Sequence, residues 1–296
     1  MNSHETGRGI VLSVAASSLF ALMSAYTRLL APLGGLDIFA WSVVWTVPGA
    51  LLLLALRGRM PQLVELAARA RREPRIAFTL PICAALMGTQ LWLFMWAPLH
   101  GRVLEVSLGY FLLPLSMVLV GRLYYRERLV PLQWLAVACA ALGVAHEFLT
   151  IHAFSWPTLV VALGYPPYFV IRRTISADSL VTFATEVLLL LPVAVVLIAT
   201  STGARAAFDH PALLAALLPG LGALSTVALA CYLRSSRMLP MALFGILGYV
   251  EPVLLLVLSI TVLGESLSVG QMATYVPIWA AVAITGVHAV LLLRTR

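Results

Sequence analysis

Ten stretches of apolar residues follow one another along the chain, each about as long as a helix that crosses a lipid bilayer, which takes about 20 apolar residues. The chain has 61% hydrophobic and 10% charged residues over its 296 positions, against about 45–50% and about 25% in soluble domains. We therefore predict an all-α integral membrane protein. Its ten transmembrane helices are expected at 10–30, 38–56, 76–97, 103–121, 131–149, 156–171, 180–200, 211–232, 240–263 and 270–293.

The arginines give an orientation to these helices. All 19 basic residues are arginines, which is typical of a GC-rich bacterial genome. If both termini are cytoplasmic, 16 of the 19 lie in or beside inner loops, while Arg102 and Arg205 lie outside and Arg28 lies within the first helix. This positive-inside bias predicts a membrane protein with cytoplasmic N- and C-termini. It also explains the net charge of +7 through contact with anionic lipids, so the expected partner is the bilayer and not a nucleic acid.

The longest polar stretch, residues 57–75, separates the second and third apolar segments. Leu63 and Leu66 lie on one face of a helix over this stretch, opposite Arg69 and Arg72. This pattern predicts a short amphipathic helix on the inner membrane surface.

A motif of the first half of the chain recurs in the second half. The unit is five helices, 1–150 and 151–296, and because five is odd the second unit is expected to enter the membrane inverted. Such inverted repeats are typical of secondary transporters that work by alternating access. At an offset of 138 or 139 positions, Gly109-Tyr110, Pro114, Glu127, Leu129 and Gln133 match Gly248-Tyr249, Pro252, Glu265, Leu267 and Gln271.

Several runs resemble the RarD-type permeases of the drug/metabolite transporter (EamA-like) superfamily, over nearly the whole chain. The resemblance implies a ten-helix inner-membrane carrier of two EamA-like repeats, in a family linked by name to chloramphenicol sensitivity. Two positions depart from the pattern, since such permeases usually carry a basic residue near Ser42 and a glycine where Arg126 stands. The matching residues are 104–111, Pro114-Leu115, 126–128, 133–137, Trp92-Leu93-Phe94, Trp96-Ala97, Tyr168, Arg172, Glu186 and 191–194.

Glu251 is the deepest acid of the predicted helices. It lies eleven residues into its segment, about 16 Å at ~1.5 Å per residue and so near the midplane. Pro252 follows it and Pro114 lies in the matching helix, so both helices are expected to be broken near a central cavity. A charge at this depth costs about 2.5–3.5 kcal/mol on insertion scales. Glu251 therefore either binds a proton or a cationic substrate group, or stays neutral and hydrogen-bonded to a neighbouring helix.

Three other charged positions are candidates. Glu186 lies about six residues from the inner end of its helix, and either faces the cavity or pairs with Arg172 or Arg173 as an inner-gate bridge. Tyr168, one turn before Arg172, is a further gate candidate. Glu105 begins its helix and is expected to pair with Arg102 or to act as an outer gate. Arg28 either faces Glu105 across the cavity or extends to the headgroups.

Six aromatic residues are candidates for the wall of a pocket for a flat organic solute, or for an interfacial belt. Tyr110 and Tyr249 are favoured because they precede the prolines. The six are Trp92, Trp96, Tyr110, Tyr165, Tyr168 and Tyr249.

No cofactor or metal is expected, because the chain has neither a phosphate-binding glycine-rich loop nor a metal-ligand spacing of histidines. Its short loops also lack the clustered acids or histidines that a membrane enzyme needs. We therefore expect a non-enzymatic secondary active transporter, an exporter of small organic metabolites or drugs, with proton coupling through Glu251 or Glu186. The alternative is a passive channel or facilitator, or a non-transporting membrane scaffold. Both a monomer and a homodimer fit the sequence.

Overall fold

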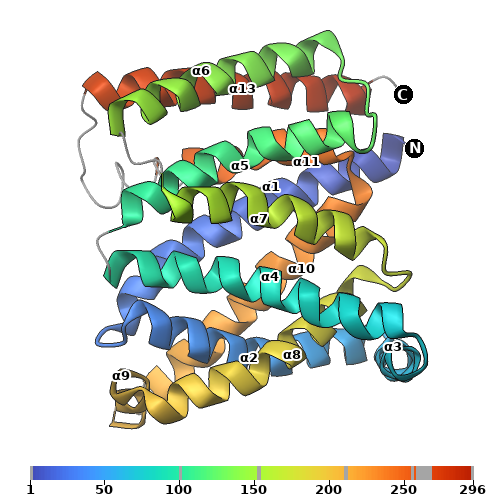
Figure 1. Ribbon diagram of the computed structural model, residues 1–296, viewed down its shortest axis with the longest axis vertical. Coiled ribbons are helices and arrows are strands. Elements are labelled where there is room, and N and C mark those ends of the chain that lie inside the picture. Colours follow the sequence, from blue (N-terminus) through green and yellow to red (C-terminus); the bar gives the residue numbers. More distant parts are fainter. Residues whose placement is uncertain are drawn as a thin grey trace. The chain divides into compact units, whose positions relative to one another are not determined.

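The computed structural model describes residues 3–99, 102–151, 155–209, 213–254, 257 and 269–294, and every regular element in these ranges is a helix (Figure 1). The helices are α1 Ser3–Tyr26, η1 Thr27–Leu30, α2 Gly35–Leu56, α3 Met60–Arg72, α4 Pro74–Leu99, α5 Val103–Leu123, α6 Pro131–Ile151, α7 Trp156–Arg173, α8 Ser179–Thr200, α9 Thr202–Arg205, η2 Ala206–Asp209, η3 Leu213–Leu217, α10 Leu218–Met238, α11 Met241–Leu247 and α13 Val269–Arg294.

Seven of the described helices are long and apolar enough to cross a bilayer, which confirms the all-α membrane class. The apolar helices Met241–Leu254 and Met272–Val287 are shorter, and α7 is less apolar because it contains three prolines and ends in Arg172 and Arg173. A count of ten spans stays a prediction. The seven are Glu5–Tyr26, Gly35–Leu56, Pro74–Leu93, Glu105–Leu123, Pro131–Thr150, Ser179–Thr200 and Ala215–Met238.

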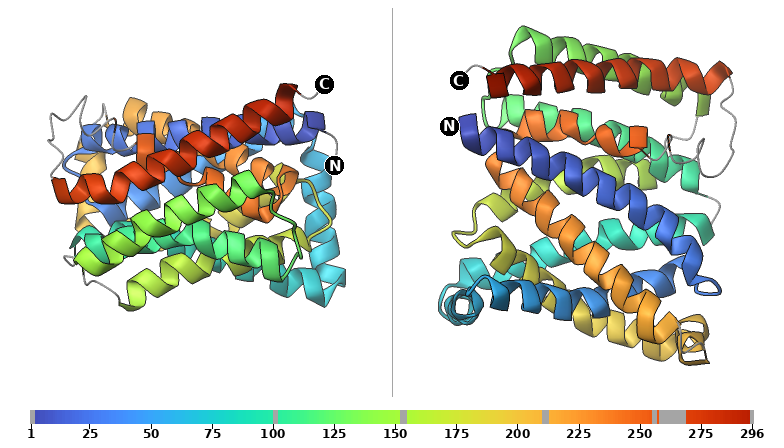
Figure 2. Two further views of the ribbon diagram at one scale, coloured as in Figure 1. Left: turned by 90° about the horizontal axis from the view of Figure 1, so that it is seen from above. Right: turned by 180° about the vertical axis from the view of Figure 1, so that it is seen from behind.

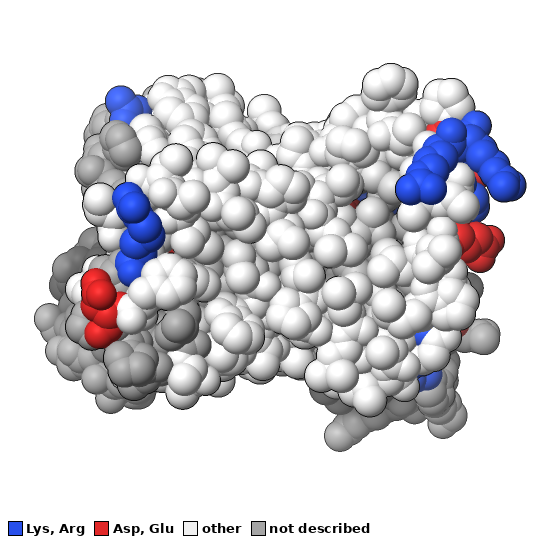
Figure 3. All heavy atoms as spheres, turned by 90° about the horizontal axis from the view of Figure 1, so that it is seen from below, with Lys and Arg blue, Asp and Glu red and all other residues white. Residues whose placement is uncertain are grey.

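Charged side chains are unevenly distributed on one face of the molecule. On the face drawn in Figure 3, uncharged residues form the middle of the surface, whereas most blue and red side chains lie at the left and right sides of the view. The predicted amphipathic helix is confirmed as α3, in which Leu66 is buried and Arg71 and Arg72 are exposed. This distribution suits a protein whose helix walls contact lipid tails.

The chain forms two compact units, and each combines segments of both halves of the sequence. Unit 1 consists of Met1–Ala21, Arg102–Pro166 and Arg234–Arg296, and unit 2 consists of Leu22–Gly101 and Pro167–Leu233.

In unit 1, α6 lies along α13 and α5 lies along α11 (Figures 1 and 2). Small residues at the contact, among them Ala140 and Ala281, let the helices approach closely. At Gly143 a Cβ atom would lie 2.5 Å from the carbonyl oxygen of Thr274, so only glycine fits there. This close packing of backbones is the usual basis of helix association in membranes, where burial from water adds little.

In unit 2, α8 packs against both α2 and α4. Trp41 of α2 belongs to the buried core of this unit, and its indole Nε1 donates a 2.9 Å hydrogen bond to the carbonyl of Ala204. Asp37 accepts a 2.6 Å hydrogen bond from the Ser201 hydroxyl. These two side chains of α2 therefore hold the start of the short α9 segment in place.

The turn after α5 carries one of the two departures from the family pattern. Glu127 accepts hydrogen bonds from the backbone N–H groups of Met241 (2.7 Å) and Ala242 (2.8 Å), so its carboxylate caps the first turn of α11. Arg126 precedes it with a φ of 54°, in the left-handed region that favours glycine. Glycine, which RarD-type permeases usually carry at this position, adopts this conformation without strain.

Replacing Arg126 by glycine is expected to raise the free energy of unfolding by about 0.5–1 kcal/mol. A left-handed conformation costs a residue with a Cβ atom about 1–2 kcal/mol, and glycine gives back about 0.5–1 kcal/mol through its freedom in the unfolded chain. Thermal unfolding in detergent micelles would measure the change. Arg128→Gly is the matched control, because Arg128 is also exposed but is not a positive-φ residue. Equal destabilisation by both substitutions would contradict the explanation.

Candidate functional site

Glu251 lies beside a break in the polypeptide's ninth apolar segment. Helix α11 ends at Leu247, Gly248 and Tyr249 form a turn, and helix resumes from Val250 to Leu254. The expected irregularity of this segment is thus present just before Pro252. The matching helix α5, in contrast, continues through Pro114 as one helix, because the loss of one backbone donor leaves the hydrogen bonds on either side intact.

Two tyrosines lie near the Glu251 carboxylate within unit 1. Tyr165 of α7 lies close enough to Glu251 for an electrostatic interaction, and a side-chain hydrogen bond joins Tyr165 to Tyr110 of α5. All three residues are half-buried. We call Glu251, Tyr165 and Tyr110 the acid–tyrosine cluster.

The three members of the acid–tyrosine cluster lie at similar depths in their helices. At ~1.5 Å per residue, Tyr110 is about 10 Å from the start of α5 at Val103 and Tyr165 is about 14 Å from the start of α7 at Trp156. Glu251 is about 15 Å from the start of α11 at Met241. In a hydrocarbon core of ~30 Å, Tyr165 and Glu251 would lie about halfway across and Tyr110 about a third of the way.

Two glycines bring the helices of the cluster together. A Cβ atom on Gly109 of α5 would lie 2.8 Å from the carbonyl oxygen of Thr158 in α7. A Cβ atom on Gly245 of α11 would lie 2.8 Å from the carbonyl oxygen of Pro114 in α5. The backbone of α5 therefore approaches those of α7 and α11 more closely than side chains would permit, next to Tyr110.

A serine compensates for a proline at the same place. Pro166 has no N–H, so the carbonyl of Ala162 lacks its usual helical donor. The hydroxyl of Ser116 in α5 donates a 2.6 Å hydrogen bond to that carbonyl. Helix α7 is thereby fixed to α5 one turn before Tyr165.

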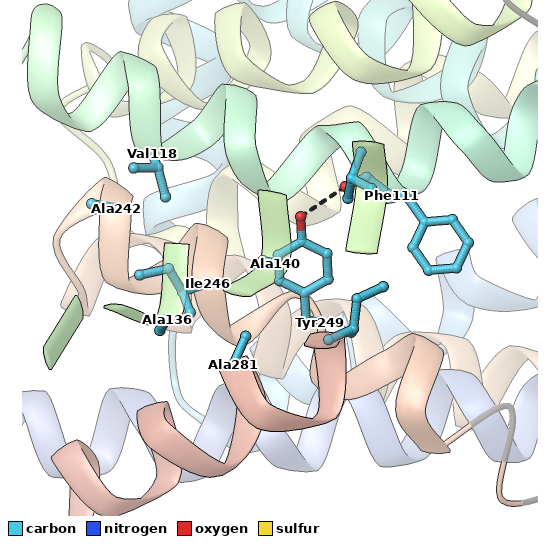
Figure 4. Packing of buried hydrophobic residues seen from close by; sticks show 10 residues of the cluster. Phe111, Val118, Ala136, Ala140, Ala242, Ile246, Tyr249 and Ala281 are labelled. Atoms are coloured by element: carbon cyan, nitrogen blue, oxygen red, sulfur yellow. Dashed lines mark hydrogen bonds between the residues drawn. The ribbon is translucent and has the colours of Figure 1, made fainter. Parts of the chain in front are cut away.

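Tyr249, favoured from the sequence, lies elsewhere in unit 1. It is 1% exposed and packs in the core between α5, α6, α11 and α13. Its hydroxyl donates a 2.9 Å hydrogen bond to the backbone carbonyl of Phe111, toward which the side chain points in Figure 4. This contact fixes the turn before Glu251 to α5.

Unit 2 contains a buried ion pair. Arg172 of α7 is 1% exposed and Glu186 of α8 is 0% exposed, and Arg172 Nε lies 3.0 Å from Glu186 Oε1. The Tyr168 hydroxyl donates to Glu186 Oε2 at 3.1 Å. Arg172 also donates to the hydroxyl (3.2 Å) and carbonyl (2.7 Å) of Ser179, whose hydroxyl donates to the Leu233 carbonyl. Every oxygen of the Glu186 carboxylate is therefore matched with a donor, as a buried ion pair requires.

Glu105 forms the expected pair with Arg102, whose Nη1 lies 3.0 Å from Glu105 Oε2. The Ser155 hydroxyl donates to the same carboxylate oxygen, and the Thr158 hydroxyl donates to the Glu105 carbonyl. Glu105 thus ties the start of α5 to the start of α7. The backbone of Arg28 is in η1, but its side chain lies outside the described part of the structure.

The two tryptophans are neighbours in unit 2, near the end of α4. The ring centroids of Trp92 and Trp96 are 5.7 Å apart with planes tilted by 38°. They form an aromatic pair, whereas Tyr110 belongs to unit 1. Within the described residues, no group of three or more His, Cys, Asp or Glu side chains could hold a metal ion.

Sequence patterns did not identify Ser116, Ser179 or Asp37. Serine is common in membrane helices, so the sequence did not indicate which group either serine contacts. Asp37 lies at a predicted helix start, where an acid is ordinary.

Comparisons with known proteins give a consistent family. The chain is 49% identical over 291 residues, 98% of this chain and 97% of the relative, to the chloramphenicol-sensitive protein RarD of Pseudomonas aeruginosa. It is 38% identical over 260 residues, 88% of this chain and 87% of the relative, to an uncharacterized transporter of Haemophilus influenzae. It is 30% identical over 298 residues, 100% of both chains, to protein RarD of Salmonella typhi.

No family model matches the chain. A solved structure titled only as the crystal structure of a protein matches with a TM-score of 0.66 and 17% identity. The match covers 95% of this chain and 98% of that chain. At this identity the likeness concerns the fold alone.

Proposed function

Because the chain belongs to the RarD family of membrane transporters, we propose that it is a secondary transporter that exports small organic metabolites or drugs, with Glu251 as the site of proton coupling. The observation that carries this proposal is the acid–tyrosine cluster. It combines a mid-depth carboxylate, a helix break and two polar aromatic side chains. Acids at such depth in membrane helices typically belong to substrate pathways or proton relays.

Glu186 is assigned a different role. Its carboxylate is matched by Arg172 and Tyr168 inside unit 2, so it already has a counter-charge, as a buried structural ion pair does. We propose that this pair is a structural bridge between α7 and α8. Proton coupling then rests on Glu251.

The proposal includes two inverted repeats, 1–150 and 151–296, that exchange inward and outward shapes. The packing of α5 with α11 and of α6 with α13 in unit 1 supports it, as does the packing of α2 with α8 in unit 2. Each pair joins a helix of one half to the matching helix of the other. The start of α5 at Val103 and the start of α11 at Met241 also differ by 138 positions, the offset of the sequence repeat.

The proposed location is the bacterial inner membrane with both termini in the cytoplasm. The arginine distribution supports it, since 16 of the 19 basic residues then belong to inner segments.

A thermal-shift screen of the purified protein at pH 5.5 and 7.5 tests the function. Amino acids, polyamines, nucleosides and amphenicols are the compounds to compare, because a ligand at ~100 times its Kd stabilises the folded state by about 2.7 kcal/mol. We expect at least one compound whose shift depends on pH and disappears in Glu251→Gln. No shift with any compound, together with a melting temperature that is independent of pH, would contradict proton coupling through this carboxylate.

A further inference from the structure

Helix α3 lies across the ends of other helices of unit 2. In Figure 1 it is seen end-on, whereas α2 and α8 of the same unit run across the view. Because α2 and α8 are candidate membrane spans, α3 runs along the membrane surface and not through the bilayer. It packs against α4 and α8, with Leu66 buried and Leu63 and Ala70 half-buried. The leucine face of this amphipathic helix therefore contacts the protein and is not available to lipid.

A second, largely apolar face of α3 is exposed. Val64 is 67% exposed, whereas Leu66, two positions along, is 2% exposed. Successive residues of a helix point about 100° apart, so these two side chains point to nearly opposite sides of α3. The exposed face consists of four residues at the helical spacing i, i+4, i+7 and i+11, which are Met60, Val64, Ala67 and Arg71.

The positive charge without an acidic partner lies at one end of this exposed face. On the side of α3 that faces the protein, Arg59 pairs with Asp178. Arg69 pairs with Glu73 and donates a 2.9 Å hydrogen bond to the carbonyl of Ser176. Three further arginines, where α3 ends and α4 begins, are exposed and take part in none of the ion pairs among the described residues: Arg71, Arg72 and Arg75.

This combination of groups fits an anionic phospholipid. Apolar side chains of a helix that lies along the membrane surface are buried at the boundary of headgroups and acyl chains. Guanidinium groups bind phosphate through two parallel hydrogen bonds. Glu65, the acid within α3, follows Val64 and so points about 100° away from it. A lipid with net negative charge also balances arginines that a zwitterionic lipid leaves uncompensated.

We propose that α3 binds an anionic phospholipid, with the headgroup phosphate against Arg71, Arg72 and Arg75 and the upper acyl chains against Met60 and Val64. Since hydrogen bonds and an ion pair hold α3 to the turn before α8, the bound lipid stabilises this end of unit 2. The inference goes beyond the proposed function and does not depend on proton coupling.

Native mass spectrometry of the purified protein in detergent measures this binding. Dioleoylphosphatidylglycerol is the anionic lipid, and dioleoylphosphatidylcholine, with the same acyl chains and no net charge, is the matched lipid. We expect the native protein to bind the phosphatidylglycerol at least about tenfold more tightly, because each arginine near the surface attracts the anionic headgroup. Equal affinity for the two lipids would overturn the proposal.

Replacement of the three arginines by glutamine should remove most of this preference. The test variant carries Arg71→Gln, Arg72→Gln and Arg75→Gln. The control removes the same number of positive charges from exposed arginines at the turn after α5, and carries Arg122→Gln, Arg126→Gln and Arg128→Gln. Loss of the preference in the test variant alone supports the site. A preference that survives in the folded test variant, or an equal loss in the control, would overturn it.

The contact with acyl chains is tested in nanodiscs that contain phosphatidylglycerol. Bimane attached at Val64→Cys should be quenched by lipids with a nitroxide on the acyl chain at least about twofold more than bimane at Gln62→Cys. Gln62 is also exposed but lies beside the turn before α8. Cys139 and Cys231 are replaced by alanine, and Cys83 is buried. Equal quenching at the two positions would contradict the proposed orientation of α3.

Discussion

Replacement of Glu186 by alanine is expected to lower the free energy of unfolding by about 3–5 kcal/mol, since removal of one partner leaves a buried charge without compensation. Arg172, which is 1% exposed in the native protein, would keep its contacts with Ser179 but would lose its carboxylate partner. The Tyr168 hydroxyl would also lose its carboxylate acceptor. Chemical and thermal unfolding of the purified protein in detergent would measure the loss.

The exposed pair on α3 supplies the control for this prediction. Arg69 and Glu73 are joined at 3.1 Å, but their side chains are 31% and 50% exposed. Glu73→Ala should therefore cost at most about 1 kcal/mol. The double substitution of Glu186→Leu with Arg172→Met should recover most of the stability, because a well-packed apolar pair needs no counter-charge. A Glu186→Ala loss no larger than that of Glu73→Ala would contradict the structural role of the bridge.

The helices were predictable because their signal is local. Runs of about 20 apolar residues have few alternatives to a membrane helix, and the described helices overlap every expected segment. The amphipathic α3 was predictable for the same reason, since its spacing of leucines and arginines alone defines two faces. The pairing of Glu105 with Arg102 is also local, at three positions along one helix.

Contacts between helices were less predictable. Arg172 and Arg173 are adjacent in the sequence, and the sequence left both as partners of Glu186. The structure selects Arg172, because successive residues of a helix point about 100° apart and the rotation of α7 against α8 decides which one meets the carboxylate.

The acid–tyrosine cluster illustrates the same limit. Glu251 was identified from its depth and from the proline that follows it, but its association with the tyrosines depends on the close approach of α5 to α7 at Gly109 and to α11 at Gly245. Tyr249 was favoured because it precedes Pro252, whereas the turn at Gly248 and Tyr249 directs its side chain to Phe111. A local helix break changes side-chain directions in a way that helical spacing does not describe.

The largest functional effect is expected from Glu251→Gln, which keeps the shape of the side chain and removes its ability to exchange a proton. In the native protein an imposed gradient across the membrane should accelerate transport, because the proton released at Glu251 moves down its gradient as substrate moves up. Glutamine cannot take up or release a proton, so the same gradient should not accelerate transport by Glu251→Gln.

Proton coupling through Glu251 is tested by flux into proteoliposomes with an acidic interior, with the compound that most stabilises the protein in the thermal-shift screen. Glu147→Gln is the control, because Glu147 is another half-buried acid of unit 1 but is hydrogen-bonded to Thr274 of α13. We predict that the gradient accelerates uptake by at least about tenfold in the native protein and in Glu147→Gln, and has no effect in folded Glu251→Gln. Equal acceleration by the gradient in Glu251→Gln would contradict coupling through this carboxylate.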